Sequence, residues 1–195
     1  SGSTNVAVGN NALTASTTAS NNTAVGNAAL GANTTGTQNT AVGADALDSN
    51  TTGSFNVAVG HDALQANITG TYNVGIGQTA LGANTGTGNT AIGGGALEAN
   101  TSSGNNTAVG HNALADNTTG GGTAVGSFSL YVSTTGTANT AVGHNSLGSN
   151  TTASNNTAVG DYALQANTTG ADNVAIGSAA LDSNTTASNN TAIGR

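Results

Sequence analysis

The fold is decided by one stretch that recurs with substitutions along the whole chain, Asn22-Thr23-Ala24-Val25-Gly26-Asn27-Ala28-Ala29-Leu30-Gly31-Ala32-Asn33-Thr34-Thr35-Gly36-Thr37-Gln38. Val or Ile followed by Gly returns every 17 residues or, twice, every 16, at Val8, Val25, Val42, Val59, Ile76, Ile92, Val109, Val125, Val142, Val159, Ile176 and Ile193. A Leu stands five residues after each of the first eleven, from Leu13 to Leu181. Such a fixed period is typical of stacked structural repeats. We therefore expect residues 1–195 to form a single repetitive array, a segment of a longer fibre.

The two shorter intervals show which part of the repeat is a loop. Both lack one residue between the Thr-Thr region and the next Val or Ile, and neither changes the five-residue spacing to Leu. Deletions are tolerated in loops and not in packed segments. The Thr-Thr-Gly segment is therefore predicted to be a surface turn, and the segment from Val to Leu to be packed.

The residue types within the repeat favour strands. Thr-Ala-Val alternates with a period of two, branched residues favour strands, and Asn, Thr and Gly are poor helix formers. The Gly after each Val suits a turn with positive φ. The sequence predicts an all-β parallel solenoid of about twelve coils of 16–17 residues, with two short strands per coil. Strands stack about 4.8 Å apart, so the rod would be about 50 Å long.

An antiparallel hairpin array is the competing all-β fold. Hairpins of this length favour Asn-Gly turns, and none of the 29 Asn residues is followed by Gly. The solenoid is therefore preferred.

Stacked coils place equivalent residues above one another. One Asn ladder is predicted to include Asn33, Asn50, Asn67, Asn84, Asn100 and Asn117, and a second to include Asn22, Asn39, Asn56, Asn73 and Asn89, with amides hydrogen-bonded along the rod. Each coil offers the core one Val or Ile, one Leu and several Ala. Because so thin a core is marginal alone, we expect self-association through the stripe of Thr or Val followed by Ala.

Composition excludes several classes of protein. Ala, Thr, Gly and Asn make up 128 of 195 residues, and the chain has one Lys or Arg against eight acidic residues. So acidic a chain is not expected to bind nucleic acid. No apolar run reaches the length of a membrane span. No Cys is available for disulfides or thiolate metal sites.

The candidate functional residues occupy the positions of the repeat that vary freely. The candidate surface contacts are Phe55, Tyr72, Phe128, Tyr131, Tyr162, His61, His111 and His144. Phe55 and Tyr72 are one repeat apart, so we expect their rings to stack. The three His residues lie two or three coils apart, too far for one metal ion, and the acidic residues are interpreted as singly scattered. With no nucleophile beside His61-Asp62, we predict no enzyme, cofactor or metal site.

Two other interpretations start from the Thr-Thr turn. Regular Thr rows on a rigid rod resemble ice-binding surfaces in general design, which leaves open an ice- or surface-binding solenoid. Asn-x-Ser/Thr sequons leave open a glycosylated extracellular filament. The candidate glycosylation sites are Asn33, Asn50, Asn67, Asn117, Asn150, Asn167 and Asn184.

The segments Asn56-Val57-Ala58-Val59-Gly60, Asn173-Val174-Ala175-Ile176-Gly177 and Asn22-Thr23-Ala24-Val25-Gly26 resemble the head repeats of YadA-like trimeric autotransporter adhesins. Similar repeats occur in phage tail-fibre proteins. The resemblance implies a left-handed β-roll that forms a homotrimeric, surface-exposed rod used in adhesion. We therefore expect a non-enzymatic rod of an extracellular fibre, on a cell or virion surface. Its partners would be further copies of itself, as a homotrimer or an end-to-end filament, and an unknown surface or receptor.

Overall fold

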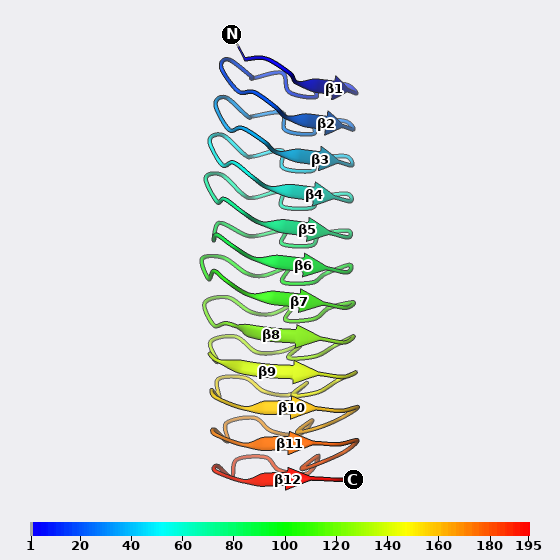
Figure 1. Cartoon of the computed structure of the whole chain (residues 1–195), viewed down its shortest axis with the longest axis vertical. Helices are drawn as coiled ribbons and strands as arrows, with labels where there is room; N and C mark the ends of the chain where they lie inside the picture. The colour runs from blue at the N-terminus through cyan, green and yellow to red at the C-terminus, as the bar shows by residue number, and fades with distance from the viewer. Residues whose placement is uncertain (1) are drawn as a thin grey trace.

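The computed structural model describes residues 2–195 and shows a rod of stacked coils (Figure 1). Its twelve strands form one parallel sheet in chain order, and no helix occurs within these residues. The predicted fold class, an all-β parallel solenoid, is confirmed. The strands are β1 (Val6–Val8), β2 (Thr23–Val25), β3 (Thr40–Val42), β4 (Val57–Val59), β5 (Val74–Ile76), β6 (Thr90–Ile92), β7 (Thr107–Val109), β8 (Gly122–Val125), β9 (Asn139–Val142), β10 (Thr157–Val159), β11 (Val174–Ile176) and β12 (Thr191–Ile193).

The prediction of two strands per coil is wrong, because each coil of the described chain contains a single strand. After the strand the backbone enters the left-handed region at alternate residues, such as Asp62 (φ 58°) and Leu64 (φ 54°). Left-handed residues interrupt an extended chain. This side of the coil still pairs with the next coil, since Leu47 N–H donates to the Ala63 carbonyl at 3.0 Å.

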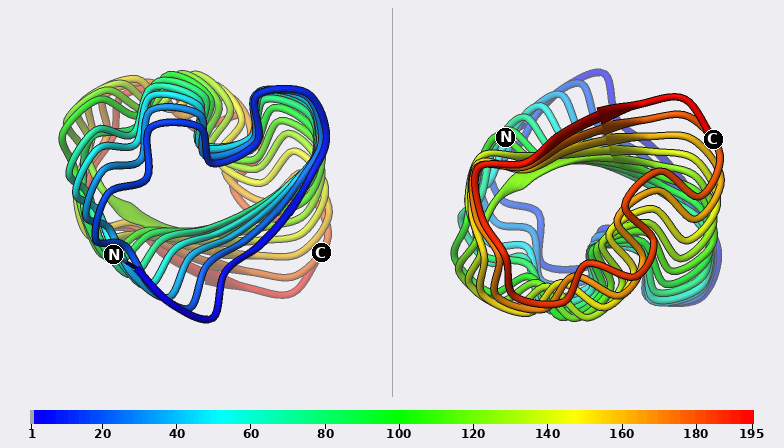
Figure 2. Two further views of the ribbon diagram at one scale, coloured as in Figure 1. Left: turned by 90° about the horizontal axis from the view of Figure 1, so that it is seen from above. Right: turned by 90° about the horizontal axis from the view of Figure 1, so that it is seen from below.

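The coil is left-handed, as the resemblance implies. In the view from above in Figure 2, the chain runs anticlockwise as it passes away from the viewer. Right-handed crossovers are the rule where a helix packs back onto the sheet. The crossovers of this rod contain no helix in residues 2–195, so that packing constraint does not act on them.

The interior is built from Leu, Ala and Asn. The middle residue of a strand, such as Ala41, is completely buried, and so are Ala46 and Leu47 farther along the coil. The expectation that Val or Ile fills the core is wrong: Val42 is 37% exposed and Ile92 39%. Side chains alternate across a strand, so burying the middle Ala turns the residues on either side of it outward.

The Gly after each strand is required by both conformation and space. Its φ lies between 127° and 141° in all twelve coils. A Cβ on Gly43 would lie 2.4 Å from the carbonyl oxygen of Gly60 in the next coil. The predicted positive φ is confirmed, and close stacking of the coils gives a second reason for Gly.

Both predicted Asn ladders are present and buried. In the first, Asn50 Nδ2 donates to Asn33 Oδ1 and to the Gly53 carbonyl, each at 3.0 Å. In the second, Asn22 Oδ1 accepts the backbone N–H of Asn39 at 2.9 Å. The ladders therefore hold successive coils in register.

The first ladder has one interruption. Ser133 takes the place of the ladder Asn in the coil of β8. Among residues 2–195, Asn117 Oδ1 and Ser133 Oγ are the two buried side-chain polar atoms without a hydrogen bond. The Ser side chain is too short to continue the row of amides.

Candidate functional site

Most of the aromatic side chains stand on left-handed corners of the coil. The φ angles are 61° at Phe55, 58° at Tyr72, 58° at Phe128 and 57° at Tyr162. A large side chain is unfavourable in this conformation, whereas Asn and Asp tolerate it. In other coils Asn and Asp occupy these corners, as at Asn11, Asp45, Asn112, Asn145 and Asp172. Backbone conformation therefore does not account for the aromatic residues.

The structure gathers five of the eight predicted surface contacts into one patch. This aromatic corner consists of His111, Phe128, Tyr131, His144 and Tyr162, from four successive coils. The Phe128 ring meets His111 at 5.3 Å, Tyr131 at 5.5 Å and His144 at 6.4 Å between centroids, always edge to face. His144 meets Tyr162 at 5.0 Å in the same manner. The patch thus combines apolar ring surface with imidazole and hydroxyl groups.

A carboxylate adds to the polar part of the aromatic corner. His144 Nδ1 lies 3.1 Å from Asp161 Oδ1, and both side chains are about half exposed. The sequence indicated the aromatic residues of the patch. It did not indicate that His111 and His144 flank the same ring, because that contact depends on the reach of side chains across stacked coils.

Phe55 and Tyr72 form a second, smaller aromatic site. Their rings stack as predicted, with centroids 4.8 Å apart and planes 3° from parallel. Both remain exposed, Phe55 by 42% and Tyr72 by 59%. The pair offers the solvent a small apolar surface just before strands β4 (Val57–Val59) and β5 (Val74–Ile76).

One group of potential metal ligands was missed in the sequence. Asp45, His61 and Asp62 have ligand atoms that all lie within 4.8 Å of one another. The interpretation of the acidic residues as scattered is wrong here, because Asp45 and Asp62 are 17 residues apart and occupy equivalent corners of adjacent coils. The signal in the sequence is this spacing of one repeat between two Asp residues, with His61 next to the second.

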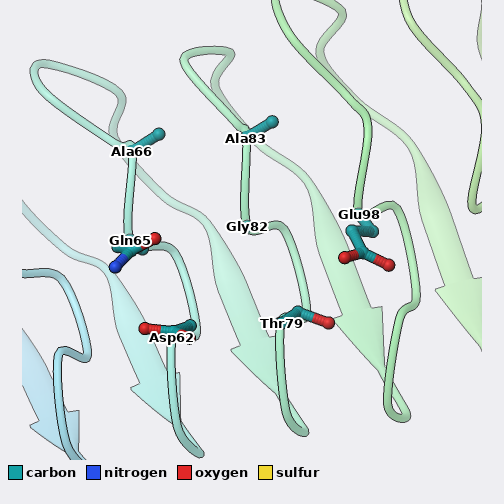
Figure 3. A pocket seen from close by; sticks show the side chains of 7 residues that line it. All are labelled: Asp62, Gln65, Ala66, Thr79, Gly82, Ala83 and Glu98. Atoms are coloured by element: carbon teal, nitrogen blue, oxygen red, sulfur yellow. The ribbon is translucent and has the colours of Figure 1, made fainter.

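A shallow groove of about 340 Å³ adjoins Asp62 (Figure 3). Its floor lies at Gly82, where neighbouring coils carry Gln65 and Glu98. The missing side chain of Gly82 leaves the hollow, and Thr79 borders it. The groove is lined by small and polar side chains together with the carboxylates of Asp62 and Glu98.

The predicted glycosylation sites are ladder residues, and the structure contradicts them as accessible acceptors. Asn33, Asn50, Asn67, Asn117, Asn150 and Asn167 are completely buried. Asn184 is half-buried, and its Nδ2 donates to Asn167 Oδ1 and to the Ala187 carbonyl, both at 3.0 Å. The sequons whose Asn is exposed lie elsewhere, at Asn21, Asn105, Asn155 and Asn189.

The predicted contact for self-association also changes. The Ala of the Thr/Val–Ala stripe points into the core, so that half of the predicted contact is wrong. The exposed surface is named the strand face. In each of the strands β1 to β12 it consists of the two residues on either side of the central Ala, or of Gly75 in β5, namely Thr or Val before it and Val or Ile after it. It presents aliphatic side chains along the rod, including Val8, Val42, Ile76, Ile92, Val125, Val142, Ile176 and Ile193.

The Thr-Thr rows differ from a free hydroxyl surface. The hydroxyl of the first Thr donates to the carbonyl of the equivalent residue in the next coil, as Thr34 does to Thr51 at 3.0 Å and Thr168 to Thr185 at 3.0 Å. These hydroxyls are part of the hydrogen-bonding that holds the coils together. The argument for ice binding from the Thr-Thr turn is weakened accordingly.

These features define a parallel β-solenoid repeat protein with Asn ladders, an architecture compatible with repeat-type fibre proteins. The chain matches no known protein family, no curated protein and no solved structure in the comparisons made. Residues 2–195 contain no helix that is long and apolar enough to cross a membrane.

Proposed function

We propose that the chain is a non-enzymatic structural rod of an extracellular fibre, an adhesin or tail fibre, that presents corner residues for attachment to a surface. The observation that carries this proposal is the aromatic corner. His111, Phe128, Tyr131, His144 and Tyr162 contribute no ring to the buried core. Exposed clustered aromatic side chains are typical of binding surfaces. Their partner would be a receptor or polymer on the surface to which the fibre attaches.

The rest of the coil supports a role as a stiff spacer. Each coil is tied to the next by strand pairing, by backbone hydrogen bonds on its far side and, except at the coil of β8, by two rows of Asn. No segment within residues 2–195 interrupts the stack of strands. A rod of this kind holds the aromatic corner at a fixed distance and orientation.

Self-association is the second part of the proposal. The strand face exposes a row of Val and Ile side chains that a single chain leaves in water, and burying apolar surface contributes about 25 cal/mol per Å². The resemblance to trimeric adhesin head repeats supports three copies around this face. A location on a cell or virion surface follows from the same proposal.

The attachment role is tested by replacing rings with the residue that the corner itself favours. Asn at Phe128 and Tyr162 keeps the left-handed backbone, so the double variant Phe128→Asn/Tyr162→Asn should remain folded. We expect it to bind an array of immobilised polysaccharides and intact cell surfaces at least tenfold less than the unaltered rod. The matched control is Asp172→Asn, which changes an exposed left-handed corner outside the patch.

Circular dichroism is the check that each variant remains folded. Equal binding by the double variant and the unaltered rod would contradict attachment through the aromatic corner. Loss of binding in Asp172→Asn as well would assign the effect to a general change of the surface rather than to the aromatic corner.

Ice binding is a second candidate, favoured by a different surface from the one that the sequence indicated. The strand face carries Thr at Thr90, Thr107, Thr123, Thr140 and Thr157, and their hydroxyls make no hydrogen bond to residues 2–195. Parallel strands repeat these hydroxyl and methyl groups at about 4.8 Å. Thermal hysteresis from a rod that stays monomeric would favour this candidate over the fibre.

A further inference from the structure

We propose that Asp45, His61 and Asp62 form a binding site for one divalent transition-metal ion, of which Zn²⁺ is the representative. The site lies on the corner that follows strands β3 and β4, away from the aromatic corner. It is independent of the attachment role, and the inference concerns binding alone.

The first argument is geometric. Three ligand atoms, one from each residue, lie within 4.8 Å of one another, and His61 Nδ1 is 2.8 Å from Asp62 Oδ2. Zinc binds His nitrogen and carboxylate oxygen at about 2.0–2.2 Å, so two ligands of a tetrahedral ion lie about 3.4 Å apart. Small side-chain rotations bring the three atoms to that spacing. A fourth position stays open to water.

The second argument is that the backbone holds the site in place before any ion binds. Asp45 and Asp62 both have φ 58° on equivalent corners of adjacent coils. The Asp45 N–H donates to the Asn27 carbonyl at 2.9 Å, and the Asp62 N–H donates to the Ala44 carbonyl at 3.1 Å. The backbone that carries the two carboxylates is therefore fixed on adjacent coils before an ion binds, which limits the conformational entropy lost on binding.

The third argument is charge. Asp45, Asp48 and Asp62 place three carboxylates in two adjacent coils, whereas the only Lys or Arg of the whole chain is Arg195. No Lys or Arg side chain in these coils offsets the negative charge. A bound divalent cation would do so.

The ligand set decides the class of ion. One imidazole nitrogen with two carboxylates suits Zn²⁺, Co²⁺ or Ni²⁺, whereas Ca²⁺ and Mg²⁺ prefer oxygen ligands alone. The other His residues provide an internal comparison. His144 has one carboxylate, Asp161, at 3.1 Å, and a single carboxylate makes a two-ligand site. A three-ligand site is therefore expected only at His61.

The test is titration of the untagged full chain with ZnCl₂ by calorimetry, with CoCl₂ absorption as a second readout of coordination. We expect one ion per chain. Asp45→Asn, Asp62→Asn and His61→Gln should each lower the affinity for Zn²⁺ by at least tenfold. Asn keeps the left-handed corner in the first two variants, so they should retain the far-ultraviolet dichroism of the rod. The matched controls His144→Gln and Asp161→Asn should bind as the unaltered chain does.

Three results would overturn the proposal. The first is no Zn²⁺ or Co²⁺ binding by the unaltered chain at millimolar metal. The second is equal loss of affinity in the His144 or Asp161 controls. The third is Ca²⁺ binding as tight as Zn²⁺ binding, which would assign the effect to unspecific attraction of cations to carboxylates.

Discussion

At the scale of single residues, the left-handed corners determine which side chains are favourable. Thr79 occupies such a corner at φ 54°, although a β-branched residue is strained there. Asn tolerates this conformation because its short side chain crowds the backbone less and hydrogen-bonds locally. We expect Thr79→Asn to raise the free energy of unfolding by about 1 kcal/mol, measured by denaturant titration followed by circular dichroism.

The reverse substitution is the matched control. Asn112 occupies the equivalent corner at φ 54°, and Asn112→Thr should lower the free energy of unfolding by a similar amount. If both substitutions shift stability in the same direction, corner strain is not the cause.

The sequence predicted correctly those features for which one residue type recurs at one position of the repeat. The period gave the stacking of coils, the invariant Gly gave the positive φ that Gly43 has at 139°, and the repeated Asn gave the ladders. It failed at Leu64, whose φ of 54° no propensity rule assigns to Leu. Because a residue in the left-handed conformation interrupts an extended chain, this segment of the coil does not form a second strand.

The sequence also failed to predict which side chains of the strand point inward. Hydrophobicity placed Val and Ile inside, yet the inward position at the middle of each strand is Ala, or Gly at Gly75, beside the buried row of Leu, so Val42 lies outside at 37% exposure. The side-chain clusters at the corners were a further failure. Contacts such as His144 with Tyr162, or Asp45 with His61, join different coils. The sequence could reveal them only if residues one repeat apart were compared by chemistry.

At the scale of an element, the Asn ladder has its weakest step at the coil of β8. Asn117 Oδ1 and Ser133 Oγ are buried without partners. A buried polar atom without a partner destabilises a protein by about 1–3 kcal/mol. Asn at Ser133 would donate to Asn117 Oδ1 and accept from Asn150 Nδ2. We expect Ser133→Asn to raise the free energy of unfolding by about 1–3 kcal/mol in the same denaturant assay.

Ser149→Asn is the control for this substitution. Ser149 directly precedes the ladder residue Asn150 and lies outside the ladder. The control should change stability by less than about 0.5 kcal/mol, as surface substitutions usually do. A gain of equal size in both variants would contradict repair of the ladder.

At the scale of the whole molecule, the strand face is the feature that a single rod leaves unsatisfied. Val125 and Val142 belong to it, on the adjacent strands β8 and β9, and each is 37% exposed. If copies of the chain meet there, two Lys side chains would be buried without partners at an apolar contact, which costs several kcal/mol. Light scattering should then show Val125→Lys/Val142→Lys at the single-chain mass of 18.3 kDa and the unaltered protein at a multiple of it.

The control must add the same charge to the same kind of rod elsewhere. Thr35 and Thr52 are exposed and lie one coil apart in the Thr-Thr turns, away from the strand face. Thr35→Lys/Thr52→Lys should therefore keep the mass of the unaltered assembly, because its charges remain in water. A mass of 18.3 kDa for the unaltered chain would contradict self-association outright. If both double variants dissociate, the added positive charge and not its position disrupts the assembly. The Val and Ile side chains of the strand face would then not be the contact.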